Sequence, residues 1–428
     1  MMKNLIIFSS LLATLFGCAG TNRPRTQADY QREIVELRAE LKTTPHDAHL
    51  WRELGVAYFE TRQYQAARKS FFQAFKCDKH EPKTLFYLGL AFEFDQRPQL
   101  ALDIYASYGR LSRFSTHRGL MKARYYWLTR RMLQTDMRAL LQQERQWTAD
   151  SASTKAVAIF PLLYQGNNPE YAALSKGLAE MLITDLSQVK SLEVVDRVRV
   201  QALFDEMALA QSGLVDETTA AKFGSMIRAG KIVRGAYTVL NERQLRVDMA
   251  FWDVQKQQFP APASRDDLLQ NLFQLEKALV FQVIENMGIE LTPAEQEKIQ
   301  RLPTQNLRAF LYYCTGLAQE DAGDYAQAAR SYLRAAELDP GFSWAVQKAE
   351  LMEDLKLVSG EPEDVLNETL ALEQPAGEEE IAENSLTTYR LDILEKNIDS
   401  NFEPGQDSRD ATDSAFDLPL SRPPRPPQ

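Results

Sequence analysis

A pattern of small and aromatic residues recurs at an interval of 34 residues near the start of the chain. The first copy comprises Trp51, Leu54, Gly55, Tyr58, Ala67, Phe71 and Ala74, and the second comprises Leu85, Leu88, Gly89, Phe92, Ala101 and Tyr105. The large residues follow the i, i+3, i+7 spacing of one helix face, and the small residues let two helices approach closely. The pattern predicts stacked helical hairpins, because a single hairpin leaves an apolar face that its neighbour must cover.

These residues resemble the tetratricopeptide repeat. A third, degenerate copy carries Gly119, Ala123 and Tyr126, with Thr135 in place of the small alanine. A fourth copy lies far downstream and comprises Gly316, Ala328, Tyr332, Ala335 and Pro340. The resemblance implies helical repeats over residues 30–148 and a further repeat over 303–350. Within that second range, Trp344, Ala345 and Ala349 predict a short capping helix.

Repeats of this family usually bind peptides on the concave face formed by the first helix of each hairpin. The resemblance places there Arg52, Val56, Phe59, Phe86, Leu90, Phe94, Arg124 and Trp127, together with His49 and Leu120. The expected groove is apolar and aromatic with scattered cations, which makes it a candidate site for a protein partner. The alternative is that the chain's own central domain fills this groove, and the sequence does not decide between the two.

The spacing of apolar residues changes between about 155 and 290. Short apolar runs predict strands at 156–160, 192–196, 231–237 and 245–251. Amphipathic spacing predicts helices at 167–188, 200–209, 217–227 and 268–287. Strands that alternate with helices indicate a layered α/β domain. The chain as a whole is therefore expected to be an α+β multidomain protein, with helical-repeat hairpins on both sides of the α/β domain.

The order of these elements carries a second resemblance. The residues involved are Pro161, Gly177, Leu178, Ala179, Leu182, the run 194–197, Leu203, Glu206, Gly224, Gly230, Arg234 and Gly235. They resemble a domain shared by curli secretion channels of the CsgG type, a flagellar lipoprotein family and the N-terminal domain of TolB. The resemblance implies a periplasmic domain at 153–292. In the curli channel, long amphipathic hairpins join two core strands and form the pore, whereas here the connection is a short turn at 241–244. A pore is therefore disfavoured.

Asp196 and Arg197 follow the second predicted strand and invite a catalytic interpretation. A carboxylate at the end of a strand commonly caps the next helix instead. An adjacent arginine then pairs locally. We therefore expect a structural role for both residues.

The first eighteen residues are typical of an export signal. Lys3 precedes an apolar run that ends at Phe16, and the residues Leu15-Phe16-Gly17-Cys18 resemble a bacterial lipobox. The resemblance implies a signal peptide over 1–17, a lipid-modified Cys18 as the first mature residue, and a tether over 18–29. Ala19, rather than Asp, after the cysteine implies an outer-membrane location facing the periplasm. The alternative is an ordinary secretory signal in which Cys18 has no role.

The last part of the chain, 359–428, is acidic and rich in proline. Seventeen acidic and five basic residues lie between 360 and 428, so this stretch carries −12, whereas the whole chain carries −10. Such a composition cannot bury enough apolar area to offset the entropy of the chain, which predicts a disordered tail. Within it, residues 386–397 have helical spacing and are a candidate docking element.

No acidic residue lies between Ile104 and Thr135, where basic residues alternate with aromatic ones. The basic residues are Arg110, Arg113, Arg118, Lys122, Arg124, Arg130 and Arg131. Such a mixture can bind nucleic acid, but an acidic, exported chain argues against that partner. The remaining interpretations are an anionic protein, a lipid headgroup, the chain's own acidic tail, or an ordinary solvated helix face.

Motifs for catalysis, cofactors or metals are absent from the sequence. It contains no Gly-rich phosphate loop and no nucleophile elbow, and its four histidines lie in the repeat region without metal-like spacing. We therefore expect no catalytic residues, no cofactor and no metal. Three cysteines are too few for a disulfide framework. A bond between Cys77 and Cys314 is left open.

These expectations converge on a non-catalytic outer-membrane lipoprotein that acts as an assembly or adaptor protein. It would bind protein partners in the periplasm or outer membrane through its repeats and its CsgG-like domain, reach the membrane through its lipid, and bind no nucleic acid. Assembly into a homo-oligomer is compatible with this prediction. The alternatives are a subunit of a curli-type secretion complex and a cell-wall-associated enzyme.

Overall fold

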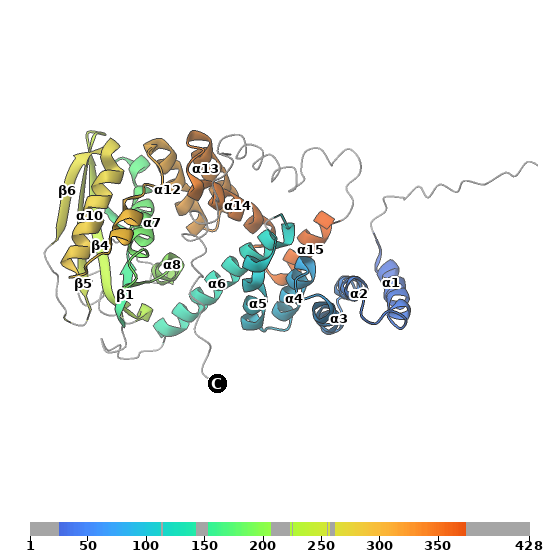
Figure 1. Ribbon diagram of the computed structural model, residues 1–428. Coiled ribbons are helices and arrows are strands. Elements are labelled where there is room, and N and C mark those ends of the chain that lie inside the picture. The colour runs from blue at the N-terminus through green and yellow to red at the C-terminus, as the bar shows by residue number, and fades with distance from the viewer. Residues whose placement is uncertain are drawn as a thin grey trace, which may run out of the picture.

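The computed structural model describes residues 25–112, 114–142, 153–206, 223–224, 226–254, 256 and 262–373. It is elongated, with a helical array at one end, a sheet at the other, and the long helix α6 (Thr116–Gln142) between them (Figure 1). The expected signal peptide, Cys18 and the helix at 386–397 lie outside the described residues, as does most of the expected helix at 217–227. The predicted α+β class is confirmed.

The N-terminal array consists of consecutive antiparallel helices. They are α1 (Gln27–Glu40), α2 (Ala48–Glu60), α3 (Tyr64–Cys77), α4 (Pro82–Phe94) and α5 (Pro98–Tyr105), followed by the short 3-10 helix η1 (Ala106–Arg110). α1 starts three residues before the expected boundary and precedes the first repeat. Its Tyr30, Ile34 and Leu37 pack against Leu54 and Ala57 of α2.

The same contact closes three of the helical hairpins. A Cβ atom added to Gly55 would lie 2.6 Å from the Phe71 ring, one added to Gly89 would lie 2.2 Å from Tyr105, and one at Gly316 would lie 2.6 Å from Tyr332. Only glycine lets the aromatic ring of the second helix lie directly on the backbone of the first. The shared contact confirms that small residues let the two helices of a hairpin approach closely.

The third, degenerate copy of the repeat forms one helix rather than a hairpin. α6 continues without interruption for 27 residues, past the point where the first two copies turn. The turns of those copies contain Thr61-Arg62-Gln63 and Asp95-Gln96-Arg97-Pro98, whereas α6 has Thr129-Arg130-Arg131-Met132 at the equivalent place. In both turns one residue is left-handed, Arg62 and Gln96, each with a φ of 57°, whereas α6 stays right-handed throughout.

The α/β domain contains a mixed sheet with the strand order β3-β1-β4-β5-β6, and β2 pairs with β4 at the edge of this path. The strands are β1 (Ser153–Ile159), β2 (Leu163–Tyr164), β3 (Glu193–Val194), β4 (Ala229–Leu240), β5 (Gln244–Asp253) and β6 (Ala263–Leu268). β1 pairs in parallel with β3 and β4, and β2 pairs in parallel with β4. β5 pairs antiparallel with both β4 and β6. The sequence predicted four of these strands and missed β2 and β6.

Three helices pack on the sheet or at its ends: α7 (Leu174–Leu186), α8 (Arg197–Glu206) and α10 (Leu272–Asn286). α10 lies against β5 and β6, while α7 and α8 both contact β1. On β5 the buried residues Leu245, Val247 and Met249 alternate with more exposed ones. This alternation is what a strand with one covered face requires.

The short turn expected between β4 and β5 is confirmed. Asn241 and Glu242 both have positive φ angles, 51° and 56°. The Arg243 amide donates a hydrogen bond to the Leu240 carbonyl at 3.1 Å. Two consecutive left-handed residues match the twist of the flanking strands, and asparagine tolerates this conformation well.

The C-terminal helices return to the rest of the molecule. They are α11 (Pro293–Gln300), α12 (Leu307–Asp321), α13 (Tyr325–Leu338), α14 (Ser343–Val358) and α15 (Pro362–Glu373). α12 and α13 form the fourth hairpin, and α14 is the expected capping helix, now longer than predicted. α12 packs on α7, and α14 packs on α6. The lone downstream repeat is therefore covered by the α/β domain and by α6.

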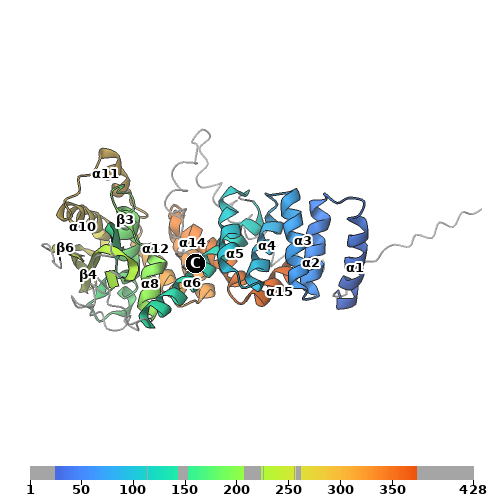
Figure 2. The same ribbon diagram turned by 90° about the horizontal axis from the view of Figure 1, so that it is seen from below.

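The prediction of a disordered tail from 359 onward is wrong for its first residues. α15 has Pro362 at its start and Glu363 and Asp364 in its first turn, both favourable at a helix N-terminus. Val365, Leu366 and Leu370 are buried. Figures 1 and 2 both place α15 beside α4.

Among the described residues, no helix combines the length and the apolar character needed to cross a bilayer.

Candidate binding groove and domain junction

The residues expected to line the groove come from α2, α4 and α6. Phe59, Phe86, Leu90 and Arg124 are buried, and Leu120 is buried with them. Arg52, Val56, Phe94 and Trp127 are half-buried, while His49 is exposed. The structure thus brings the predicted set together on one side of the array, but it leaves only His49 exposed, and Arg52, Val56, Phe94 and Trp127 partly accessible.

The occupant of the groove is the chain's own C-terminal segment. α15 packs against α4, and the connection from α14 to α15 crosses Arg124 of α6. The Arg124 guanidinium donates to the carbonyl oxygens of Val358 at 2.6 Å and of Gly360 at 2.8 Å. The open groove is therefore corrected to a largely filled one. The central domain was the alternative occupant of the groove expected from the sequence, but the residues that contact the groove are 358–373.

Arg124 is held in place by Glu93 of α4. Its Nε and Nη2 atoms donate to the two Glu93 carboxylate oxygens at 2.9 and 2.7 Å, and its guanidinium lies 4.2 Å from the centre of the Trp127 ring. Tyr105 donates its hydroxyl to the same carboxylate at 2.8 Å. The buried cation therefore has a counter-charge, and it supplies hydrogen bonds to the unpaired carbonyls at the end of α14.

Two further ion pairs flank α15. Arg131 of α6 pairs with Glu361 at 2.7 Å, and Arg62, in the turn after α2, pairs with Glu363 at 3.0 Å. Beside the first pair lies a cavity of about 400 Å³, lined among others by Trp127, Leu128 and Pro362. The chain's own segment therefore does not fill the groove completely.

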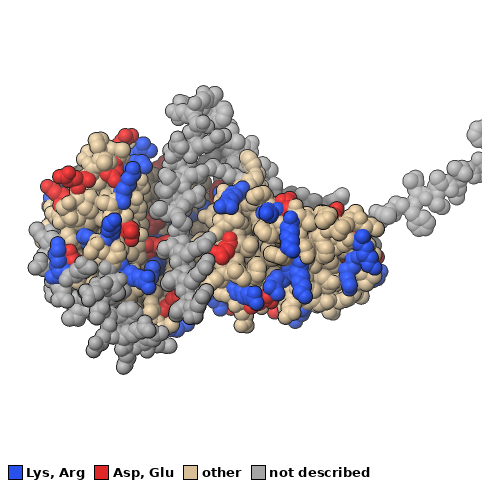
Figure 3. All heavy atoms as spheres, turned by 60° about the horizontal axis from the view of Figure 1, so that its bottom comes forward, with Lys and Arg blue, Asp and Glu red and all other residues tan. Residues whose placement is uncertain are grey.

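The contacts of Arg124, Arg130 and Arg131 show what three of the seven basic residues of the segment between 104 and 135 do. Arg130 donates to the carbonyl oxygen of Glu320 at 2.8 Å and to that of Asp321, so it caps the end of α12. Arg124 likewise caps the end of α14 through the Val358 carbonyl oxygen, and Arg131 pairs with Glu361, near the start of the expected tail. Figure 3 shows lysine and arginine side chains at several places over the helical array on the face in view. Arg113 lies outside the described residues.

A buried ionic cluster joins the fourth hairpin to the α/β domain. Its centre is Glu320, which is fully buried near the end of α12. Lys348 of α14 contacts both Glu320 oxygens at 3.0 Å, and Arg197 of α8 contacts one of them at 3.0 Å. Tyr126 and Tyr332 donate their hydroxyls to the same carboxylate. Burial alone would raise the pKa of Glu320, but the charges of Lys348 and Arg197 outweigh it and hold this pKa well below its usual value.

Arg197 connects three acidic residues at this junction. It pairs with Asp321 at 2.6 Å, with Glu320, and with Glu180 of α7 at 3.1 Å. Asp321 also pairs with Lys176 of α7. The expectation that Arg197 pairs locally is wrong, because two of its partners lie more than 120 residues further along the chain.

Asp196 has the role expected for it. Its carboxylate accepts a hydrogen bond from the Val198 amide at 2.8 Å, at the start of α8. Burial raises the pKa of Asp196 although that hydrogen bond opposes the change. The residue thus caps a helix, as the position after a strand indicated.

A second buried charge cluster, which the sequence did not indicate, lies between α7 and α10. Lys277 contacts Asp185 at 2.5 Å and Glu276 at 3.4 Å. Neither Glu276 oxygen has a hydrogen-bond partner among the described residues. Burial, and then the charge of Asp185, raises the pKa of Glu276 well above its usual value, while burial raises that of Asp185 to about 6.

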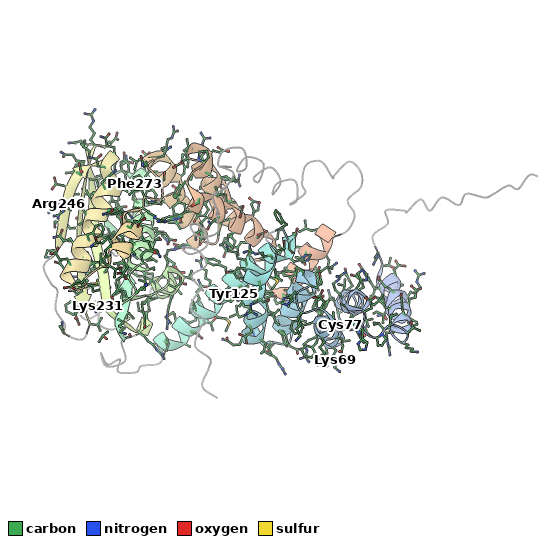
Figure 4. The ribbon with its side chains drawn as sticks, in the orientation of Figure 1. Lys69, Cys77, Tyr125, Lys231, Arg246 and Phe273 are labelled. Carbon is green, nitrogen blue, oxygen red and sulfur yellow. The ribbon has the colours of Figure 1, made fainter. Side chains whose placement is uncertain are left out.

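The cysteines Cys77 and Cys314 are not joined. Cys77 is exposed at the end of α3, and Cys314 is buried in α12. Figure 4 places Cys77 in the N-terminal array and Phe273 at the far end of the molecule. The Phe273 ring lies 5.3 Å from that of Phe310, one turn from Cys314, so the two thiols are remote from each other.

Within the residues that the structure describes, no three histidine, cysteine, aspartate or glutamate side chains gather as a metal site would require.

Comparison with known families identifies two parts of the chain. Residues 151–246 match the model of the curli production assembly/transport component CsgG, and residues 309–342 match that of the tetratricopeptide repeat. No curated protein matched the chain. The two matches indicate a role in assembly or in protein–protein interaction. The chain therefore combines a CsgG-like domain with a tetratricopeptide repeat.

Proposed function

We propose that this protein is an outer-membrane lipoprotein, anchored through Cys18 and facing the periplasm, that acts as a non-catalytic assembly adaptor. The observation that carries the proposal is the junction at Glu320, which holds a repeat hairpin rigidly on a CsgG-like domain. Repeats present a surface for a protein partner, and the CsgG-like domain supplies a second surface for docking or self-assembly. A rigid link between them lets one partner be positioned against another.

The anchor is tested by labelling cells with radioactive palmitate. Wild-type protein should incorporate the label and fractionate with the outer membrane, whereas Cys18→Ser should do neither. The lipobox residues motivate this expectation. Equal labelling of both proteins, or labelling of neither, would contradict the anchor.

The adaptor role is tested by site-specific photocrosslinking in cells. A photoreactive amino acid at His49, on the accessible part of the concave face, should yield adducts with envelope proteins. The same amino acid at Lys69, exposed on α3 (Figure 4), serves as the matched control and should yield none. Identical adduct patterns at both sites would argue against the repeats as the binding surface.

A second candidate is a subunit of a curli-type secretion complex, which the CsgG match favours. The Cys18→Ser protein would then form large rings and conduct ions through liposomes. An adaptor would remain a monomer or small oligomer and would leave liposomes sealed. Light scattering and conductance measurements on the same preparation separate the two.

A further inference from the structure

The contact between α15 and the helical array has two chemically distinct parts. At its start, Glu361 and Glu363 pair with Arg131 and Arg62 of the array. Further along, Val365, Leu366 and Leu370 are buried. The array therefore presents cations where α15 presents carboxylates, and an apolar surface where α15 presents aliphatic side chains.

The ionic part of this contact is open to water, whereas the apolar part is buried. The side chains of Arg62 and Glu363 are 76% and 47% exposed, and those of Arg131 and Glu361 are 50% and 63% exposed. Ion pairs so accessible to water contribute little to stability. In addition, Glu361 and Pro362 line a cavity of about 400 Å³ together with residues of α4 and α6, so the start of α15 leaves part of the groove unfilled.

We propose that the groove of the N-terminal array binds an acidic amphipathic helix from another protein, and that α15 occupies this site until the partner displaces it. The proposal rests on the adaptor function. The sequence of α15 defines the chemistry expected of the partner helix. The partner should have two carboxylates two residues apart at its start, as Glu361 and Glu363 are. Aliphatic residues should follow two, three and seven positions after the second carboxylate, as Val365, Leu366 and Leu370 do. Arg62 and Arg131 select the carboxylates, and the surface between them takes the aliphatic side chains.

α15 is tethered by only three residues, Ser359 to Glu361, so it competes at a high effective concentration. The apparent affinity for a partner is the intrinsic affinity multiplied by the fraction of molecules with an open groove. Weakening α15 therefore raises the affinity for an added ligand without changing the groove itself.

The probe for this site is a fluorescein-labelled peptide of residues 359–373, added to the full-length Cys18→Ser chain. The double substitution Val365→Asp and Leu366→Asp should release α15 and raise the affinity for the peptide at least about tenfold over the parent chain. Leu372→Asp, at an exposed position of the same helix, is the matched control and should behave like the parent. Adding Arg62→Glu and Arg131→Glu to the released chain, or Glu361→Lys and Glu363→Lys to the peptide, should weaken binding, because each exposed attraction becomes a repulsion.

Hydrogen exchange on the unsubstituted chain provides a measurement that needs no variant. The amides of α15 should exchange at least about a hundredfold faster than those of α14, because the docked segment opens while the core stays closed. Equal protection of the two helices would overturn the proposal. So would a released chain that keeps its circular dichroism spectrum but does not bind the peptide.

A released chain that dimerises in light scattering would assign the groove to a second copy of this protein, which also overturns the proposal. Crosslinks from His49 report on the accessible end of the array and are independent of α15. The peptide and exchange experiments can therefore refute the proposal for α15 without refuting the adaptor function. The adaptor function is refuted only by the crosslinking experiment at His49.

Discussion

One buried arrangement of three side chains occurs twice in this protein. Glu93 accepts a hydrogen bond from the Tyr105 hydroxyl and pairs with Arg124 of α6. In the same way, Glu320 accepts a hydrogen bond from the Tyr332 hydroxyl and pairs with Lys348 of α14. The two glutamates and the two tyrosines are each separated by 227 residues, as are Gly89 and Gly316. Equivalent positions of two repeats therefore carry the same carboxylate, which fixes the following helix by charge.

Replacing Glu320 by Gln should destabilise the protein by about 3 kcal/mol, because Lys348 would lose its counter-charge and Arg197 one of its three, while both remain buried. Arg334→Ala is the matched control, since it removes an exposed pair with Glu337 and should change stability little. Urea denaturation monitored by circular dichroism measures both. Similar losses for the two variants would refute the assignment of Glu320 as the centre of the junction.

The cluster of Asp185, Glu276 and Lys277 should make stability depend on pH. The pKa of Glu276 is raised, and that of Asp185 is raised to about 6, so the folded state keeps protons that the unfolded state releases above pH 4. The contribution of these groups to the free energy of unfolding is therefore full below about pH 4 and falls as pH rises through 6.

Glu276→Gln should remove most of this decline, so the variant should gain stability relative to the parent between pH 5 and pH 8. Each pKa unit of the original shift corresponds to about 1.4 kcal/mol. Glu285→Gln, on the exposed side of the same helix, should follow the parent at every pH. Parallel curves for the Glu276 variant and the parent would contradict the prediction.

At the scale of elements, close helix crossings decide how the parts meet. α7 crosses α12 at Gly177, where an added Cβ would lie 2.1 Å from the Cys314 sulfur. This crossing joins the CsgG-like domain to the tetratricopeptide repeat, next to the ionic junction. The sequence did not predict this contact. It places Gly177 only within the CsgG-like domain, and it makes Cys314 only a candidate for a disulfide bond with Cys77.

Gly177→Ala should therefore destabilise the protein by about 1–3 kcal/mol, because a methyl group has no room at this crossing. The same substitution at Gly109, where an added Cβ meets nothing within 4 Å, should change stability little. Adding Cys314→Ala to the Gly177 variant should recover part of the loss, since it removes the clashing sulfur. Additive losses in this double-mutant cycle would show that the two residues do not interact.

Two of the elements that escaped prediction, β6 and α15, did so for different reasons. β6 has the sequence Ala-Ser-Arg-Asp-Asp-Leu, which lacks the alternation and the β-branched residues of a typical strand. It is extended because β5 pairs with it along its whole length. α15 did have a local signal, since Pro362 with Glu363 and Asp364 marks a helix start. The acidic composition of the whole tail obscured that signal.

At the scale of the molecule, both repeat regions make contacts within the chain. The N-terminal array holds α15, and the fourth hairpin holds the CsgG-like domain through Glu320 and Asp321. α6 contacts α4, α8 and α14, and thus links the two ends. The described parts should consequently unfold together.

Calorimetry of the Cys18→Ser chain should show one transition. Arg197→Ala removes contacts with Glu180, Glu320 and Asp321 at once and should split it in two, because the α/β domain and the repeats would no longer be coupled. Arg265→Ala, at an exposed position of β6, should leave a single transition. One transition at a lower midpoint in the Arg197 variant would show that coupling persists through other contacts.

The sequence by itself determined the local geometry of this protein. Glycine and aromatic spacing specified the hairpins, and Asn241 helped specify a tight turn, because these features depend on residues close in the chain. The tertiary structure decided which surfaces meet: Arg197 with Glu320, Gly177 with Cys314, and α15 with the groove. Those contacts join residues up to about 300 positions apart, and their free energy depends on the burial of both partners, which a periodic pattern does not encode.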